Sequence, residues 1–160
     1  MATACTHARK RIIIHTDGSC IGNPGPGGWA CHITDGQRER LIAGGKAHAT
    51  SSRMELLAAI KALEALRHPG LLVSVITDSN YVKDGITKWL PNWKTNGWRT
   101  SDKKPVKNAD LWTRLDQQSA IHEVEWRWVR GHSGNPGNEL VDRAAYDAAH
   151  RAAVEGDFND

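Results

Sequence analysis

A long amphipathic segment flanked by two apolar runs constrains this chain more than any other feature. Residues Ser52–His68 carry apolar side chains at helical spacing, begin with the capping-box pattern Ser52-x-x-Glu55 and end before Pro69–Gly70. Arg11–His15, before this segment, is rich in β-branched residues, and Leu71–Ile76, after it, is continuously apolar, as in a strand buried on both faces. A helix between two strands favours a crossover that pairs them in parallel.

Further strands and helices are expected on either side of this unit. Gly18–Gly28 holds five glycines and two prolines and is predicted to be a shaped loop. Asp35–Gly36 is a hairpin-turn signal between two apolar runs, Gly28–Thr34 and Arg38–Ala43. Beyond the apolar strand we expect a broken helical region at Ser79–Trp93, a helix at Asp110–Ser119, a half-exposed strand at Glu123–Val129 and a helix at Glu139–Ala153. This order predicts an α/β fold with a mixed five-stranded sheet flanked by helices.

Length and composition indicate one domain. The chain has 160 residues, of which 39% are hydrophobic and 24% charged, as in a globular domain. We expect a single domain over 1–160, with a core at about 11–153 and flexible ends at 1–10 and 154–160. No apolar run approaches the ~20 residues of a membrane span, and Met1–Arg11 lacks the apolar stretch of a secretory signal, so no membrane partner is expected. The three cysteines form no CxxC pair, which favours a reducing compartment, and we expect a cytoplasmic monomer.

Positive charge and tryptophan are concentrated in one segment. The formal net charge of the chain is +3, yet Tyr81–Arg114 alone holds eight Lys or Arg against three Asp or Glu, with four of the seven tryptophans. Three of these tryptophans alternate with basic residues, a pattern typical of a phosphate-tracking surface on aromatic supports: Trp89, Trp93 and Trp98. Three lysines either belong to that surface or form an ordinary solvated face: Lys103, Lys104 and Lys107.

Four carboxylates are predicted to meet at one edge of the sheet. Asp17 and Asp78 follow two hydrophobic strands, and Glu55 and Asp142 fall in the first turns of two predicted helices. Singly, each has an ordinary explanation as a turn, capping or solvated residue. Together they are expected to converge, because strand carboxyl ends and helix starts share one edge of an α/β sheet. Converging carboxylates repel one another unless a cation binds, and hard oxygen ligands suit Mg²⁺ or Mn²⁺.

Two further features suit phosphodiester chemistry. His132 lies in a glycine-flanked loop; by itself it is an ordinary surface residue, but beside a metal–carboxylate cluster it is a candidate proton shuttle. The glycine-rich segment lacks the following Lys-Ser/Thr of a P-loop, so its glycines are better suited to close contact between main-chain amides and a sugar–phosphate backbone. The residues alone therefore indicate a metal-dependent nuclease or phosphotransferase, in which two ions activate water and stabilise a leaving oxygen.

Five stretches of the sequence resemble bacterial type 1 ribonuclease H. They are TDGSCIGNPGPGGWA, SSRMELLAAIKALEAL, TDSNYVKDGITKW, NWKTNGWRTSDKKPVKNADLW and WRWVRGHSGNPGNELVDRAA. They occur in the family's order from about Arg11 to about Ala153. The resemblance implies the ribonuclease H-like fold with a basic helical protrusion at roughly Trp89–Lys104. It also implies cleavage of the RNA strand of RNA–DNA hybrids with two Mg²⁺ ions, leaving 3′-hydroxyl and 5′-phosphate ends.

The resemblance further implies roles for individual residues. The metal-binding carboxylates match Asp17, Glu55, Asp78 and Asp142, an acid near the second metal matches Glu139, and the loop histidine matches His132. A minor-groove contact matches Asn23, and a phosphate pocket for the DNA strand matches Thr50 and Asn108. Four positions depart from the family's usual residues, and contacts to the hybrid are expected to be weaker there. Ser51, Ser52 and Asn80 are smaller than the residues that the family often has, and His48 stands where the family often has arginine.

Two alternative functions are compatible with the same motifs. One is a related polynucleotidyl transferase, such as an integrase core, although such proteins usually carry additional DNA-binding domains that a chain of 160 residues has no room for. The other is a non-catalytic module that binds hybrids or double-stranded RNA, which would be expected to lose at least one of the four acids. A cleavage assay on hybrid, RNA duplex and DNA duplex separates the three functions.

Overall fold

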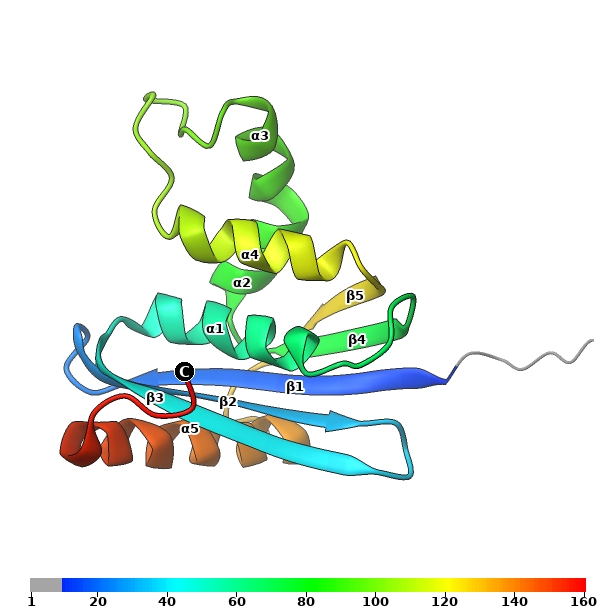
Figure 1. The fold of residues 1–160 in the computed structure, drawn as a ribbon, viewed down its shortest axis with the longest axis vertical. Helices are drawn as coiled ribbons and strands as arrows, with labels where there is room; N and C mark the ends of the chain where they lie inside the picture. Colours follow the sequence, from blue (N-terminus) through cyan, green and yellow to red (C-terminus); the bar gives the residue numbers. More distant parts are fainter. Residues whose placement is uncertain (1–9) are drawn as a thin grey trace, which may run out of the picture.

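A five-stranded sheet in the order β3-β2-β1-β4-β5 forms the centre of the computed structural model, which describes residues 10–160 (Figure 1). The strands are β1 (Arg11–Cys20), β2 (Gly25–Thr34), β3 (Glu39–Ala49), β4 (Leu72–Thr77) and β5 (Glu123–Trp128). β1, β2 and β3 pair antiparallel, and β4 and β5 add in parallel to β1. The predicted mixed sheet is confirmed. A flexible N-terminus was expected at residues 1–10. Residues 1–9 lie outside the described part of the chain, which begins at Lys10.

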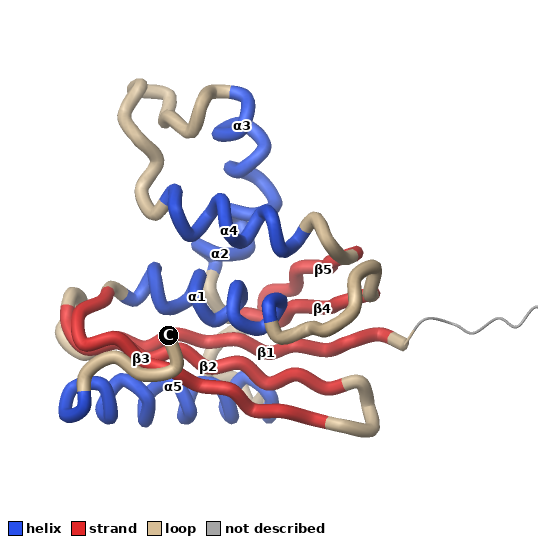
Figure 2. Tube along the Cα trace, in the orientation of Figure 1, coloured by secondary structure: helices blue, strands red, loops and turns tan. Residues whose placement is uncertain are grey.

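Helices cover both faces of the sheet (Figures 1 and 2). α1 (Ser51–Glu64), α2 (Asn80–Asp84) and α4 (Ala109–Ser119) lie on one face, and α5 (Pro136–Glu155) lies on the other. The larger core lies under α1 and includes side chains that are fully buried: Ile14, Leu56, Ile60, Val75 and Trp112. A smaller core of Ala30, Val141 and Ala145 lies under α5. None of the described helices is long and apolar enough to cross a membrane.

The glycine-rich segment is more regular than its composition indicates. Instead of a loop over Gly18–Gly28, β1 continues to Cys20 and β2 begins at Gly25. A Cβ at Gly18 would lie 2.5 Å from the backbone nitrogen of Glu55, and a Cβ at Gly28 would lie 2.3 Å from the backbone oxygen of Ala145. These glycines let α1 and α5 approach the sheet closely, so the prediction of a loop was wrong because local propensity does not register helix packing.

The first residue of α1 is Ser51, one residue before Ser52, where the predicted capping box begins. Thr50 is the N-cap, and its Oγ1 accepts a hydrogen bond from the backbone nitrogen of Arg53 at 3.3 Å. The helix then ends at Glu64, before the predicted His68. Because Ser52 is already helical, Glu55 is not a capping residue, and it lies in the second turn of α1 rather than the first.

The basic segment forms a protrusion from the sheet side that carries α1. α2 is followed directly by a π-helical turn, η1 (Gly85–Trp89), and by α3 (Leu90–Thr95), and these elements with the loop to α4 project away from the sheet (Figure 1). The Trp93 ring centroid lies 5.9 Å from that of Trp89, 6.4 Å from that of Trp98 and 5.5 Å from that of Trp112. Trp112 belongs to the main core. The tryptophans therefore join the protrusion to the domain as a continuous aromatic cluster.

The C-terminal segment, for which a flexible end at 154–160 was expected, lies against the edge of the sheet. α5 continues to Glu155, and beyond it the backbone nitrogen and oxygen of Phe158 hydrogen-bond to those of Gly45 in β3, each at 3.0 Å. The guanidinium of Arg151 lies 4.0 Å from the centroid of the Phe158 ring. The main-chain groups of an edge strand such as β3 can pair with another segment. The sequence of the C-terminal segment has no periodic pattern that would predict this pairing.

Candidate active site and nucleic-acid interface

Strand register brings Asp17 beside Asp78. The parallel pairing of β1 and β4 ends with Thr16 opposite Thr77, and Asp17 and Asp78 are the next residues of the two strands. The prediction that Asp17 follows its strand was wrong. Asp17 lies inside β1 and is paired with Ala30 of β2. Both carboxylates therefore reach the edge where the parallel ladder stops, and Asp17 is only 4% exposed.

Glu55 reaches the same edge because α1 rests on Gly18. The close approach of the Glu55 backbone to Gly18 places this helix directly over the strand residue that follows Asp17. Carboxylate oxygens of Asp17, Glu55 and Asp78 lie within 4.8 Å of one another. Three of the four predicted metal ligands thus converge, and they come from three different elements of the fold.

Burial and mutual repulsion raise the pKa of two of the three carboxylates, Asp17 and Glu55. Burial, together with the negative charge of Asp78, raises the pKa of Asp17 to about 8. Burial and the neighbouring Asp17 also raise the pKa of Glu55 well above its ordinary value. Glu55 as a residue is partly exposed, but its Oε2 is buried and has no hydrogen-bond partner among residues 10–160. An unpartnered buried carboxylate oxygen is costly unless a ligand compensates it.

The fourth predicted carboxylate comes from the opposite face of the sheet. Asp142 lies in the second turn of α5, not the first, because this helix begins at Pro136. It is not one of the three residues within 4.8 Å of one another, yet its carboxyl interacts with Asp17 and contributes to raising the pKa of Asp17. Asp142, Glu139 and His132 line one cavity of about 830 Å³. The structure thus brings the loop histidine and the two predicted α5 acids to one hollow, and of these residues Asp142 also interacts with Asp17.

Asp78 is held by neighbours that the sequence motifs did not single out. Asn138 is 2% exposed, and its Nδ2 donates a hydrogen bond to Asp78 Oδ2 at 3.2 Å. Trp128 Nε1 donates to the backbone oxygen of Asp78 at 2.9 Å. A Cβ at Gly131 would lie 2.9 Å from Asp78 Oδ2, so this glycine leaves room for the carboxylate. Asn135 caps α5, and Asn138 lies three residues later, in the first turn of the helix. This position in the sequence does not predict that Asn138 contacts Asp78.

Arg53 connects the two residues of the predicted phosphate pocket. Its backbone nitrogen donates to Thr50 Oγ1, and its Nη1 donates to Asn108 Oδ1 at 3.1 Å. Asn108 adopts a positive φ of 61°, and its Nδ2 donates to the hydroxyl of Tyr81 at 3.0 Å. Thr50 and Asn108 therefore stand at the starts of α1 and α4 in fixed orientations. Sequence reasoning missed Arg53 and Tyr81 as the residues that orient this pair.

The other predicted contact residues lie at helix starts and on the protrusion. Asn23 Oδ1 accepts a hydrogen bond from the backbone nitrogen of Ser51 at 3.1 Å, which ties the β1–β2 connection to α1, where Ser52 is the next residue. Asn80, at the start of α2, is exposed. The predicted lysines are also exposed: Lys103, Lys104 and Lys107. Of the predicted tryptophans, Trp89 is 38% exposed, whereas Trp93 and Trp98 are half-buried and support the others.

The acidic cluster fits divalent cations. It offers only carboxylate oxygens, which are the ligands preferred by hard divalent ions and poor ligands for a softer metal. Its raised pKa values and the unpartnered Glu55 Oε2 are both relieved by a bound positive charge. The residues present therefore fit a divalent metal centre at the carboxyl ends of the parallel strands.

The chain is similar over most of its length to known proteins of one kind. The family model RNase H matches residues 9–150. A ribonuclease H of Rhodopseudomonas palustris (strain BisB5) is 59% identical over 138 residues, covering 86% of this chain and 91% of the relative. A ribonuclease H of Maricaulis maris (strain MCS10) is 56% identical over 134 residues, covering 84% and 90% of the two chains.

A solved structure shares the fold described above. The crystal structure of LC9-RNase H1, a type 1 RNase H with the type 2 active-site motif, superposes with a TM-score of 0.81 at 30% sequence identity. The match covers 98% of this chain and 80% of that one. With its sheet, its acidic cluster and its family match in agreement, the chain belongs to the ribonuclease H family.

Proposed function

We propose that this chain hydrolyses the RNA strand of RNA–DNA hybrids, leaving 3′-hydroxyl and 5′-phosphate ends, with Asp17, Glu55, Asp78 and Asp142 as the ligands of two Mg²⁺ ions. The observation that carries this proposal is the convergence of three carboxylates within 4.8 Å in a chain of the ribonuclease H family. When bound, the ions would supply a water of lowered pKa and positive charge against the leaving oxygen. Mn²⁺ has the same ligand preference and is the expected substitute.

The residues around the cluster divide the remaining work. Asn138 holds the Asp78 carboxylate and Trp128 holds the Asp78 backbone, and both would help to orient this residue as a metal ligand. His132, exposed beside Asp142 and Glu139, is placed to carry a proton between the reacting phosphate and solvent. Glu139, in the first turn of α5, lines the same cavity as Asp142 and would add negative charge near a second ion.

Recognition of the hybrid is assigned to groups outside the carboxylate cluster. The Thr50 hydroxyl, which already accepts from Arg53, has its proton to donate to a phosphate of the DNA strand, and Asn108 stands beside it through Arg53. Minor-groove contacts are assigned to Asn23, Ser51, Ser52 and Asn80. The protrusion would track the backbone with its exposed lysines on the aromatic cluster: Lys103, Lys104, Lys107, Trp89, Trp93 and Trp98.

A gel assay with end-labelled substrates tests the proposal. The chain is incubated with hybrid, RNA duplex and DNA duplex, each with Mg²⁺, with Mn²⁺ and with chelator. Metal-dependent cutting of RNA only within the hybrid is the expected result, and Asp17→Asn serves as the inactive control. Strand joining would instead indicate a transferase, and retarded but uncut hybrid in the presence of metal would indicate a binding module. We also propose that the chain acts as a cytoplasmic monomer, which gel filtration and fractionation of the bacterial cell would test.

A further inference from the structure

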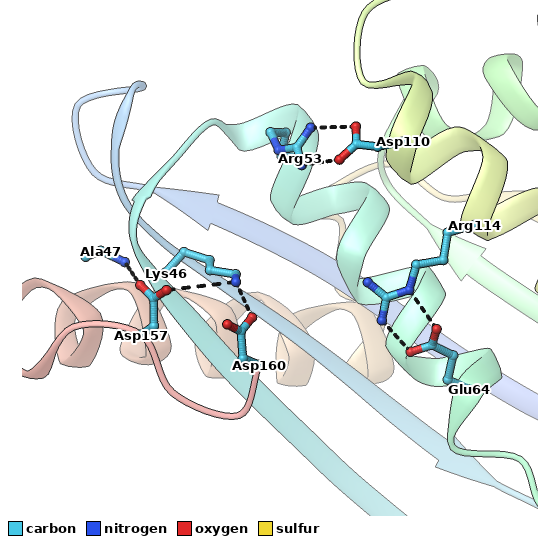
Figure 3. Close-up of polar contacts among 8 residues, drawn as sticks. All are labelled: Lys46, Ala47, Arg53, Glu64, Asp110, Arg114, Asp157 and Asp160. Atoms are coloured by element: carbon cyan, nitrogen blue, oxygen red, sulfur yellow. Dashed lines mark hydrogen bonds and ion pairs between the residues drawn. The ribbon is translucent and has the colours of Figure 1, made fainter.

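A basic groove lies next to the proposed phosphate pocket. It includes His48 and Arg53, which are named above, and two lysines, Lys46 and Lys61, that have no part in the assignments above. Its volume is about 600 Å³, and it is bounded by β3, α1, α4 and the C-terminal segment (Figure 3). Basic side chains from three of these elements line it: Lys46, His48, Arg53, Lys61 and Arg114. The Arg53 side chain donates to Asn108 Oδ1 and its backbone nitrogen donates to Thr50 Oγ1, so one residue borders both the groove and that pocket.

The two arginines of the groove already have acidic partners from the helices. Arg53 makes a bidentate pair with Asp110, at 2.7 and 3.0 Å. Arg114 makes a bidentate pair with Glu64, at 2.6 and 2.7 Å. Such paired arginines are held in place, and their charges are largely compensated. The excess positive charge of the groove therefore resides on its lysines.

Among the described ion pairs of the groove lysines, the lysine is Lys46 and the acids come from the C-terminal segment. Lys46 Nζ forms ion pairs with Asp160 and, at 3.9 Å, with Asp157 (Figure 3). Lys61 lies over the ring of Trp29, with Nζ 5.7 Å from the ring centroid. The pKa of Asp160 is lowered by Lys46, with Lys61 and Arg114 adding smaller effects. The Asp160 carboxylate thus lies in the positive field of three groove residues.

The segment that delivers these carboxylates is held by few contacts. Phe158 pairs with Gly45, Asp157 Oδ1 accepts from the Ala47 backbone nitrogen at 2.7 Å, and Asn159 Nδ2 donates to the Ala43 backbone oxygen at 2.8 Å. Asp157 and Asp160 themselves are exposed. Exposed ion pairs contribute little to stability, so this segment can be displaced at modest cost.

We propose that the groove is a further phosphate subsite for the DNA strand of a bound hybrid, and that Asp157 and Asp160 occupy it as an intramolecular substitute for phosphate. A carboxylate between lysines presents the same charge and acceptor oxygens that a backbone phosphate presents. Because Arg53 lines the groove and also contacts Thr50 and Asn108, we expect the phosphate next to the one at Thr50 and Asn108 to be attracted toward Lys46 and Lys61. The C-terminal segment therefore competes with substrate. This inference rests on the proposed function.

The test compares charge variants that keep the side-chain shapes. D157N/D160N removes both carboxylates from the groove, and D35N/E155Q removes the same charge from the β2–β3 turn and the end of α5. Dissociation constants for a fluorescent RNA–DNA hybrid are measured by anisotropy in chelator, so that the hybrid stays intact, over a range of salt concentrations. D157N/D160N is expected to bind about 3–10-fold more tightly than the control, with a salt slope steeper by ~0.9 for one additional phosphate that the groove neutralises.

A second set of variants identifies the groove as the source of the effect. A chain ending at Gly156 is expected to gain affinity in the same way, and K46A/K61A introduced into it is expected to remove the gain and the additional slope. Thermal melts check that each variant is folded. If D157N/D160N binds with the affinity and slope of D35N/E155Q, the segment is only a brace for β3 and the inference is overturned. That result leaves the proposed function intact when the wild-type chain cuts hybrid, whereas a wild-type chain that neither cuts nor binds hybrid overturns both.

Discussion

Asp17 and Asp78 lie one position beyond Thr16 and Thr77, the last residue pair of the parallel ladder between β1 and β4. The register of two strands thus sets the spacing of two proposed metal ligands, and burial next to Asp78 raises the pKa of Asp17 to about 8. In the metal-free protein the carboxylates of such a site repel one another. A bound cation relieves this repulsion, which makes cation binding more favourable.

Asp17→Asn should abolish most of the activity without unfolding the protein. Asparagine keeps the shape of the side chain but removes a charged ligand, so turnover at saturating Mg²⁺ should fall by more than about a hundredfold. Steady-state cleavage of hybrid measures this, and a melt of the same sample shows whether the fold is kept. Turnover near the wild-type value would exclude Asp17 from the metal site.

The stability of the metal-free protein should fall as the pH rises through neutrality. The pKa of Asp17 is raised from 3.8 to about 8 on folding, so the folded state keeps a proton that the unfolded state has lost. The contribution of this group to stability is therefore complete below pH ~4 and is lost progressively as the pH rises to about 8. Melts between pH 5 and 9 in chelator should show this decline, a smaller decline in Asp17→Asn, and recovery of the wild-type chain on addition of Mg²⁺. A pH dependence that is the same in both proteins would contradict the assignment.

Replacing the three exposed lysines of the protrusion should weaken binding rather than catalysis. In K103Q/K104Q/K107Q, KM should rise while kcat changes little, because phosphate contacts far from the reacting bond are largely uniform binding. The salt slope of hybrid binding should flatten by ~0.9 for each phosphate that the variant no longer neutralises. R38Q/R40Q/R67Q is the control, since it removes the same charge near the β2–β3 turn and the α1–β4 connection, at the opposite end of the parallel strands. Equal slopes in the two variants would show that the lysines form only a solvated face.

His132→Ala should slow turnover while leaving metal and substrate binding nearly intact. A positioned proton-transfer group contributes about 10²–10⁴-fold, and the metal ligands do not include this side chain. Measurements of kcat, hybrid affinity and Mg²⁺-dependent melting on the same variant separate these effects. His68→Ala is the matched control, because His68 precedes β4 and so lies at the end of the sheet away from the carboxylates. Loss of Mg²⁺ binding would instead make His132 part of the metal site, and an unchanged kcat would make it an ordinary surface histidine.

Asn138→Ala should impair the metal site from outside the ligand set. Without the hydrogen bond to Asp78 Oδ2, this carboxylate is free to rotate, and loss of such an orienting group typically costs about 10–100-fold in metal affinity or activity. Asn135→Ser keeps a side-chain cap on α5 and is the control for disturbance of the helix start. A higher Mg²⁺ requirement in Asn138→Ala alone is expected. If both variants lose activity to the same extent, Asn138 acts only through the stability of α5.

The elements of the fold and the convergence of Asp17, Glu55 and Asp78 at one sheet edge could be predicted from the sequence because the signals are local. Apolar periodicity marked the helix that becomes α1 and the buried strand that becomes β4, and Asp78 follows that strand as predicted. Glu55 and Asp142 were assigned to first turns and lie in second turns, because the true helix starts are set by Thr50 and Asn135. An error of a few residues in a helix start leaves an acid near the same sheet edge, so the site survived it.

Tertiary structure alone decided what the glycines and the last residues do. The local composition of Gly18–Gly28 indicates a loop, but α1 and α5 need strand positions without side chains in order to pack against the sheet. Phe158 has no periodic partner in its own segment, and it becomes ordered because Gly45 offers unpaired main-chain groups and leaves space for its ring. Contacts between residues distant in sequence depend on how the elements are stacked, and a pattern within one segment carries no record of them.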